Sequence, residues 1–143
     1  MMEKEDQLKL NEFLEAWQDI PQKTKKAFIQ LKDYLAGKND VMLTFNERPG
    51  ITYSLKAAHL KQKKRDLFAM VDVIDDDPEN RWLSVCFYDD MITDPEEKGD
   101  FVPEGLFGQD AHCIDLYEWS EKSLSYLEKR LDEAYENAFK EGL

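Results

Sequence analysis

The longest apolar stretches of the chain lie between Asp66 and Tyr88. Two apolar runs, DLFAMVDVI and WLSVCFY, flank the turn-forming cluster DDDPENR. Both runs are rich in β-branched and aromatic residues and are apolar on both faces, apart from Asp72 in the first run. The pattern predicts a β-hairpin that supplies the two central strands of a sheet. Asp72 then lies near solvent at a strand end or has a buried partner.

Two more strands precede this hairpin. Asp40–Asn46 alternates apolar and polar residues, and Glu47–Gly50 contains the Pro and Gly of a tight turn. Ile51–Ala57 alternates again, which is typical of an antiparallel strand with one buried and one polar face. The polar face of this second strand carries Thr52, Ser54 and Lys56.

Three segments show helical spacing. Residues 6–19 place apolar side chains three and four positions apart, and a second helix is predicted from about Pro21 to Ala36, with Gly37 as its end. Ser120 is a suitable helix N-cap, and a continuous apolar stripe follows it to about Lys140. The sequence therefore predicts two N-terminal helices and one long C-terminal helix.

Residues 89–111 show no strong period and contain two prolines and three glycines. Connections of this length are uncommon within a compact domain and are often functional. We predict an ordered excursion packed on the sheet edge, followed by a short fifth strand at His112–Tyr117.

These elements predict a single α+β domain over residues 1–143, with a five-stranded, mainly antiparallel sheet. A chain of 143 residues can bury a sizeable core without disulfide or metal staples. Short turns between consecutive strands make a meander the simplest topology.

Charge narrows the range of partners. The net charge of −12 argues against general nucleic-acid binding, because a phosphate backbone repels an acidic surface. The charge is uneven: residues 23–65 hold 11 basic and 3 acidic residues, whereas residues 66–143 hold 6 and 22. A chain polarised in this way can pair with a second copy, so we expect a homodimer.

No apolar run approaches the ~20 residues of a membrane span, and the acidic N-terminal stretch lacks the apolar core of a secretory signal. These features predict a cytoplasmic protein without membrane binding. In that compartment Cys86 and Cys113, each in an apolar strand-like context, are expected to be reduced, buried thiols.

No motif for catalysis or cofactor binding is present: the dinucleotide-binding, P-loop, nucleophile-elbow and paired-cysteine patterns are all missing. His59 and His112 are too few for a multi-histidine zinc site. The acidic residues of 89–111 supply oxygen ligands but fail the spacing of an EF-hand, which leaves an irregular calcium site or a solvated loop. We therefore expect no cofactor and no metal.

One candidate ligand site remains, between the polar face of the second strand and the acidic loop 89–111. In it, cationic groups would hold an anion and loop carboxylates would act as acid, base or metal-binding groups. Its residues are Arg48, Thr52, Ser54, Lys56, Asp89, Asp90, Asp94 and His112. The alternative is an ordinary solvent-facing strand, with an exposed basic connection at His59–Arg65. His112 and Cys113 point to opposite strand faces, so they do not form a nucleophile–base pair, and His112 can instead hydrogen-bond the loop.

Three runs carry a resemblance to a known family. They are RPGITYSL (48–55), RWLSVCFYDDMITDPEEKGD (81–100) and VPEGLFGQDAHCIDLYE (102–118). Over roughly residues 41–140 the chain resembles an uncharacterised bacterial family of small stand-alone proteins. The resemblance implies no catalytic residue, but it implies that the segment after the fourth strand is characteristic of the family.

The chain has no catalytic motif, an uneven distribution of charge and a long loop rich in Pro and Gly. These features favour a non-enzymatic binding or interaction module, with a protein or a small polar ligand as its partner. The alternative is a small enzyme or ligand-binding protein that uses the candidate site above. A cleft lined by those residues, with an acid of raised pKa, would favour the enzyme.

Overall fold

Three α-helices and six strands make up the computed structural model, which describes residues 1–143. Helices α1 (Lys4–Ala16) and α2 (Thr24–Ala36) come first, and α3 (Glu121–Glu141) comes last. The strands are β1 (Val41–Arg48), β2 (Thr52–His59), β3 (Ala69–Ile74), β4 (Trp82–Tyr88), β5 (Asp100–Leu106) and β6 (Gln109–Leu116), and a short 3-10 helix, η1 (Asp89–Met91), follows β4. The predicted α+β class is confirmed.

The sheet is antiparallel throughout, in the order β1-β2-β3-β4-β6-β5. The prediction of a five-stranded meander was therefore wrong in its number of strands. The predicted fifth strand corresponds to β6 and pairs with β4 as expected, but the excursion 89–111 contains an additional strand, β5, at the edge of the sheet. The regular alternation of β5 is lost because its register with β6 shifts between Val102 and Leu106, around Pro103 and Gly105.

A two-residue turn joins β5 to β6. Phe107 and Gly108 have φ angles of 50° and 79°, the left-handed values that a tight hairpin turn requires. Leu106 and Gln109 face each other across this turn. We call residues 103–109 the hairpin tip.

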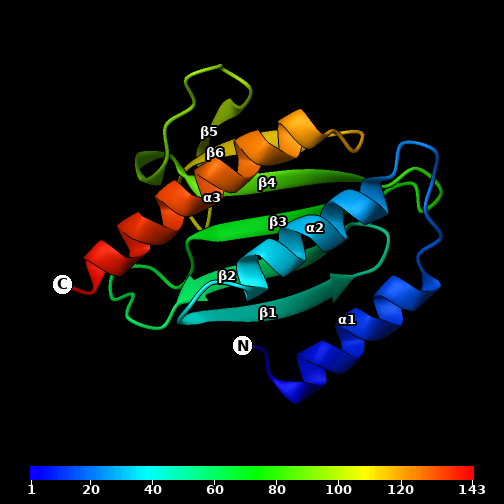
Figure 1. The fold of residues 1–143 in the computed structure, drawn as a ribbon, viewed down its shortest axis with the longest axis horizontal. Helices are drawn as coiled ribbons and strands as arrows, with labels where there is room; N and C mark the ends of the chain where they lie inside the picture. The colour runs from blue at the N-terminus through cyan, green and yellow to red at the C-terminus, as the bar shows by residue number, and fades with distance from the viewer.

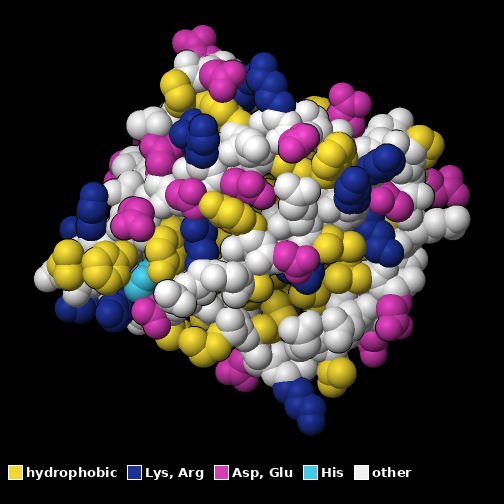
Figure 2. Space-filling model, viewed as in Figure 1, with side chains coloured by type: hydrophobic (Ala, Val, Ile, Leu, Met, Phe, Trp, Pro, Cys, Tyr) yellow, Lys and Arg dark blue, Asp and Glu magenta, His cyan; other side chains and the backbone are white.

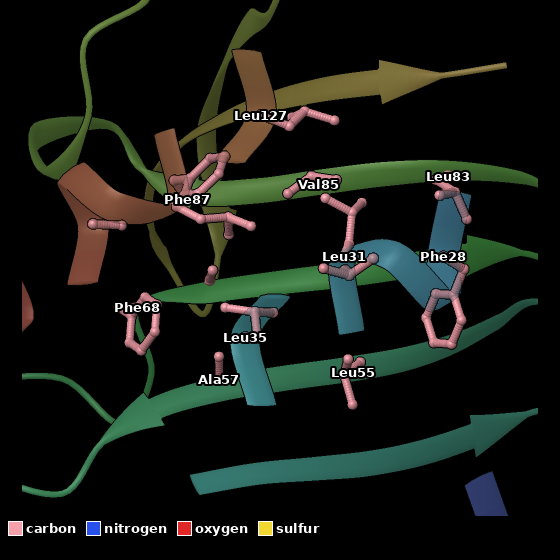
Figure 3. Close-up of a cluster of buried hydrophobic side chains, with 14 of the residues drawn as sticks. Phe28, Leu31, Leu35, Leu55, Ala57, Phe68, Leu83, Val85, Phe87 and Leu127 are labelled. Atoms are coloured by element: carbon pink, nitrogen blue, oxygen red, sulfur yellow. The ribbon is translucent and has the colours of Figure 1, made fainter. Parts of the chain in front are cut away.

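The helices lie on one face of the sheet (Figure 1). The α2 and α3 helices run across its centre, and α1 lies beside β1. Between the helices and the sheet is a continuous core, in which Leu31 and Leu35 of α2 meet Leu55 of β2 and Val85 of β4 (Figure 3). All four side chains have no exposed surface.

Local chemistry explains the helix starts. Ser120 accepts a hydrogen bond from the Ser123 amide at 3.3 Å, as predicted for the N-cap of α3. The α2 helix begins at Thr24, three residues later than predicted, because Lys23 has a left-handed φ of 60°. Thr24 is tied to the carbonyl of Arg81 at 2.8 Å, which fixes the start of α2 next to β4.

No helix covers the opposite side of the sheet, which we call the uncovered face. The β5–β6 hairpin curls behind β4 on this side (Figure 3), and its tip brings the Phe107 ring to 5.0 Å from Lys56 Nζ on β2. The hairpin tip therefore roofs one end of the uncovered face.

Cys86 and Cys113 form a disulfide, so the prediction of reduced thiols was wrong. The two residues are direct partners in the register of β4 and β6, with their Cα atoms 4.1 Å apart. Only this register, which the sequence does not reveal, brings the two side chains together.

The uneven charge of the sequence is partly neutralised by the fold. Lys38 after the basic helix α2 pairs with Asp132 of the acidic helix α3 at 2.5 Å, and Arg65 pairs with Asp90 at 2.8 Å. Basic and acidic side chains are accordingly interspersed across the helix-covered side of the molecule (Figure 2). None of the helices combines the length and the apolar character needed to cross a membrane.

Candidate functional site

The eight candidate residues fall into three groups in the structure. Arg48, Thr52, Ser54 and Lys56 lie along the uncovered face. Asp89, Asp94 and His112 form a cluster beneath α3, on the other side of the sheet. Asp90 lies apart from both groups, in an ion pair. The sheet therefore separates the second-strand residues from most of the acidic ones.

The first group belongs to rows of side chains that cross the uncovered face. Ser54 faces Asp72, which faces Ser84, which in turn faces Asp115. The Ser54 hydroxyl donates to Asp72 at 2.5 Å, so Asp72 has the buried partner that the sequence left open. At the end of the face, Arg48 donates to the Thr52 hydroxyl at 2.9 Å.

Burial raises the pKa of the Asp72 carboxyl, and the Ser54 hydrogen bond and the nearby Arg48 and Lys56 oppose this effect. Ser54 itself is 5% exposed, so this part of the second strand is not an ordinary solvent-facing one. The row provides a polar, partly enclosed floor on the uncovered face.

The second group is centred on Asp94, whose side chain is 8% exposed. Its carboxylate accepts hydrogen bonds from the Tyr126 hydroxyl on α3, from the Gly99 and Lys98 amides, and from His112 Nε2 at 2.8 Å. The other nitrogen of His112 is 3.3 Å from Asp89. His112 therefore hydrogen-bonds the loop, as the sequence analysis suggested.

Burial disfavours the charged form of Asp94, but the hydrogen bonds from Tyr126, His112 and the two amides outweigh it and hold its pKa well below its usual range. A carboxyl held ionised in this way is a poor general acid or base near neutral pH. The geometry identifies Asp94 as the anchor of the segment between η1 and β5.

Asp90 is held by Arg65 in the connection between β2 and β3. The two guanidinium nitrogens of Arg65 donate to the two Asp90 oxygens at 2.8 and 3.0 Å, and this pairing lowers the pKa of Asp90. The same guanidinium stacks on the Tyr88 ring at 4.3 Å and donates from Nε to Gln109 at 2.9 Å. Arg65 thus joins η1 to the hairpin, and its donors are engaged.

A cavity of about 420 Å³ lies under the hairpin tip, between β1, β2 and the 64–67 connection. Its lining is mixed. Polar and charged side chains come from Thr44, Lys56, Lys64, Arg65, Asp66 and Gln109, and apolar surface comes from Met42, Ala58, Leu67, Tyr88 and Phe107. Lys56 is the one residue of the predicted site that lines this cavity. Thr52 is four residues earlier on the same strand, which is about 13 Å away.

No group of three or more His, Cys, Asp or Glu side chains is arranged to hold a metal ion. In the Asp89–His112–Asp94 cluster the reason is geometric. Both ring nitrogens of His112 are directed at carboxylates, and Asp94 is already occupied by backbone and tyrosine donors.

Sequence reasoning missed most of the residues that shape the cavity. Phe107 and Gln109 reach it only because the hairpin curls over the sheet, and no periodic pattern signals that curl. The available signal was Gly108, because glycine readily takes the positive φ that a two-residue hairpin turn requires.

Comparison of the chain with models of known protein families gave no match, and neither curated proteins nor solved structures yielded a similar one.

Proposed function

We propose that this protein is a non-enzymatic binding module whose site is the cavity under the hairpin tip, where it takes up a small polar ligand. The observation that carries the proposal is the cavity itself. It has a volume of about 420 Å³, within the range of roughly 300–1,000 Å³ that is usual for ligand sites, and it combines an apolar lining with a few polar groups.

The state of the acidic residues supports binding over catalysis. Asp90 is neutralised by Arg65, and the Asp94 and His112 side chains are fully used in holding the loop. An enzyme of the alternative kind would need at least one of these groups free beside a cleft. Asp72 has a raised pKa, but it does not line the cavity.

A thermal-shift screen with nucleotides, small acids and divalent metals tests the proposal. Ala58 lines the cavity, so Ala58→Phe should fill it and abolish any ligand-induced rise in Tm. Ala16→Phe, on the exposed end of α1, is the matched control and should respond like the wild type. A ligand response that survives Ala58→Phe would place the site elsewhere.

Homodimerisation also stays a proposal, together with membership of the bacterial family that the three runs resemble. The proposed cytoplasmic location is opposed by the Cys86–Cys113 disulfide, because structural disulfides are rare in that compartment. Unlike charges on two copies would pair across a two-fold axis, and salt would weaken that pairing. Light scattering should therefore give a mass that falls toward that of the monomer as salt rises. A mass that does not change with salt would argue against charge-driven assembly.

A further inference from the structure

We propose that the ligand of this cavity is a small organic anion, with its carboxylate or phosphate on Lys56 and an apolar or aromatic body under the hairpin tip. The inference rests on the proposed function and specifies its ligand. Within a chain of net charge −12, this cavity is a place where cationic groups gather.

Lys56 is the proposed anchor. It is half-buried and forms no ion pair within 4.0 Å, and its ammonium lies over the face of the Phe107 ring, 5.0 Å from the ring centre. A partly desolvated ammonium without an ion-pair partner interacts more strongly with an incoming anion than a fully hydrated one. Lys64, which is exposed at the rim, also has no such partner and adds a second positive charge.

Neutral donors surround the anchor. Thr44 is the direct neighbour of Lys56 in the β1–β2 register, and its hydroxyl lines the same cavity. Gln109 accepts the Arg65 Nε–H through its Oε1, which directs its amide nitrogen, a donor, away from Arg65. Ammonium, hydroxyl and amide donors together suit the several acceptor oxygens of a carboxylate or phosphate.

The rest of the lining suits the body of the ligand. Met42 and Ala58 form an apolar floor on the sheet, and Phe107 forms the roof. The Phe107 side chain is 64% exposed, although it lies over a cavity, so burying it against a ligand would be favourable. The one carboxylate of the lining, Asp66, is exposed at the rim and leaves the anchor free.

Isothermal titration calorimetry at low salt with matched aromatic probes tests the ligand class. Benzoate and phenyl phosphate supply the two anionic head groups, and benzamide is a neutral analogue of benzoate. We expect at least one anion to bind at least tenfold more tightly than benzamide. Lys56→Gln should weaken binding of that anion at least tenfold, whereas Lys63→Gln, on the exposed connection between β2 and β3 and outside the cavity, should leave it nearly unchanged.

The outcomes separate the two proposals. If benzamide binds as tightly as the anions, or if Lys56→Gln has no effect while Ala58→Phe abolishes binding, the cavity is a ligand site and the anion assignment is wrong. If no probe binds, and nothing in the thermal-shift screen raises Tm in an Ala58-dependent way, the proposed function fails and the anion assignment fails with it.

Discussion

Asp94 shows how one residue can order a long segment of irregular sequence. Its carboxylate collects donors from α3, from β6 and from its own loop. A charged acceptor in such a network contributes more than a neutral one, since each hydrogen bond to a charged group is worth about 1.5–3 kcal/mol. The segment between η1 and β5 therefore has a fixed path despite its prolines and glycines.

Replacing Asp94 by Asn should lower the free energy of unfolding by about 2 kcal/mol at pH 7. The pKa of Asp94 is depressed in the folded protein, so its contribution is complete above the unfolded pKa, near 3.9, and is lost as the pH falls toward the folded value. Urea unfolding from pH 7 to pH 3 should show the gap between wild type and variant closing below about pH 4.

Asp89→Asn is the control for this prediction. The Asp89 side chain is 43% exposed and makes one long contact of 3.3 Å with His112, so the variant should lose much less stability. A gap between wild type and Asp94→Asn that stayed constant down to pH 3 would mean that the charge of Asp94 does not matter.

At the scale of elements, the β5–β6 hairpin decides where the cavity forms. Its strand β5 is exposed along most of its length, and Leu106 is the residue that holds it down, with 1% exposure. The neighbouring Phe107 is largely exposed, and its ring lies 5.0 Å from the Lys56 ammonium. Leu106 therefore anchors the hairpin, whereas Phe107 covers the cavity.

Leu106→Ala should lower the free energy of unfolding by about 3 kcal/mol, as is usual for a buried leucine, and should speed hydrogen exchange across 103–111. Phe107→Ala should cost less than about 1 kcal/mol, because only an exposed ring and its cation–π contact are lost. Chemical denaturation and exchange mass spectrometry measure both effects. Equal losses for the two variants would show that Leu106 is not the anchor.

The elements with a clean period were predictable from sequence, and β5 was not. β1 to β4 and α3 have apolar residues at regular spacing, because each buries one face against the same core. The β5 strand buries only Leu106, and its bulge around Pro103 breaks the alternation, so it looked like a loop. The regular alternation of β2 likewise predicted that Lys56 lies on its polar face. The residues across the cavity from Lys56 could not be predicted, because their positions depend on how the β5–β6 hairpin bends.

At the scale of the whole molecule, the disulfide joins the two halves of the sheet, and 27 residues separate its cysteines. Closing a loop of that length in the unfolded chain contributes about 3.5 kcal/mol. Dithiothreitol should lower the Tm of the wild type by several degrees and leave a Cys86→Ala/Cys113→Ala variant unchanged. Two reactive thiols in protein denatured without reductant would contradict the bond.

In the folded molecule the charges are distributed differently from their order along the sequence. The sequence alone presents a basic half and an acidic half, but the fold places α2 beside α3 and Arg65 beside Asp90. Hydrogen bonds from Tyr34 and Lys38 to Asp132 join the same two helices. Part of the charge separation seen along the sequence is therefore neutralised within one molecule, through Lys38 and Arg65, whereas Lys56 has no ion-pair partner.

The strand order β4-β6-β5 has a consequence for how the chain folds. Neighbours in β1–β4 are joined by short connections, and β5 and β6 by two residues, so both units can form from local contacts. Pairing β4 with β6 instead requires closing the loop 89–108, which carries a larger entropic cost. The Cys86–Cys113 bond and the His112–Asp94 contact both lie at this seam. Docking of a preformed hairpin onto β4 is thus the expected late step of folding, and the disulfide then keeps β4 and β6 linked at this seam even when the protein unfolds.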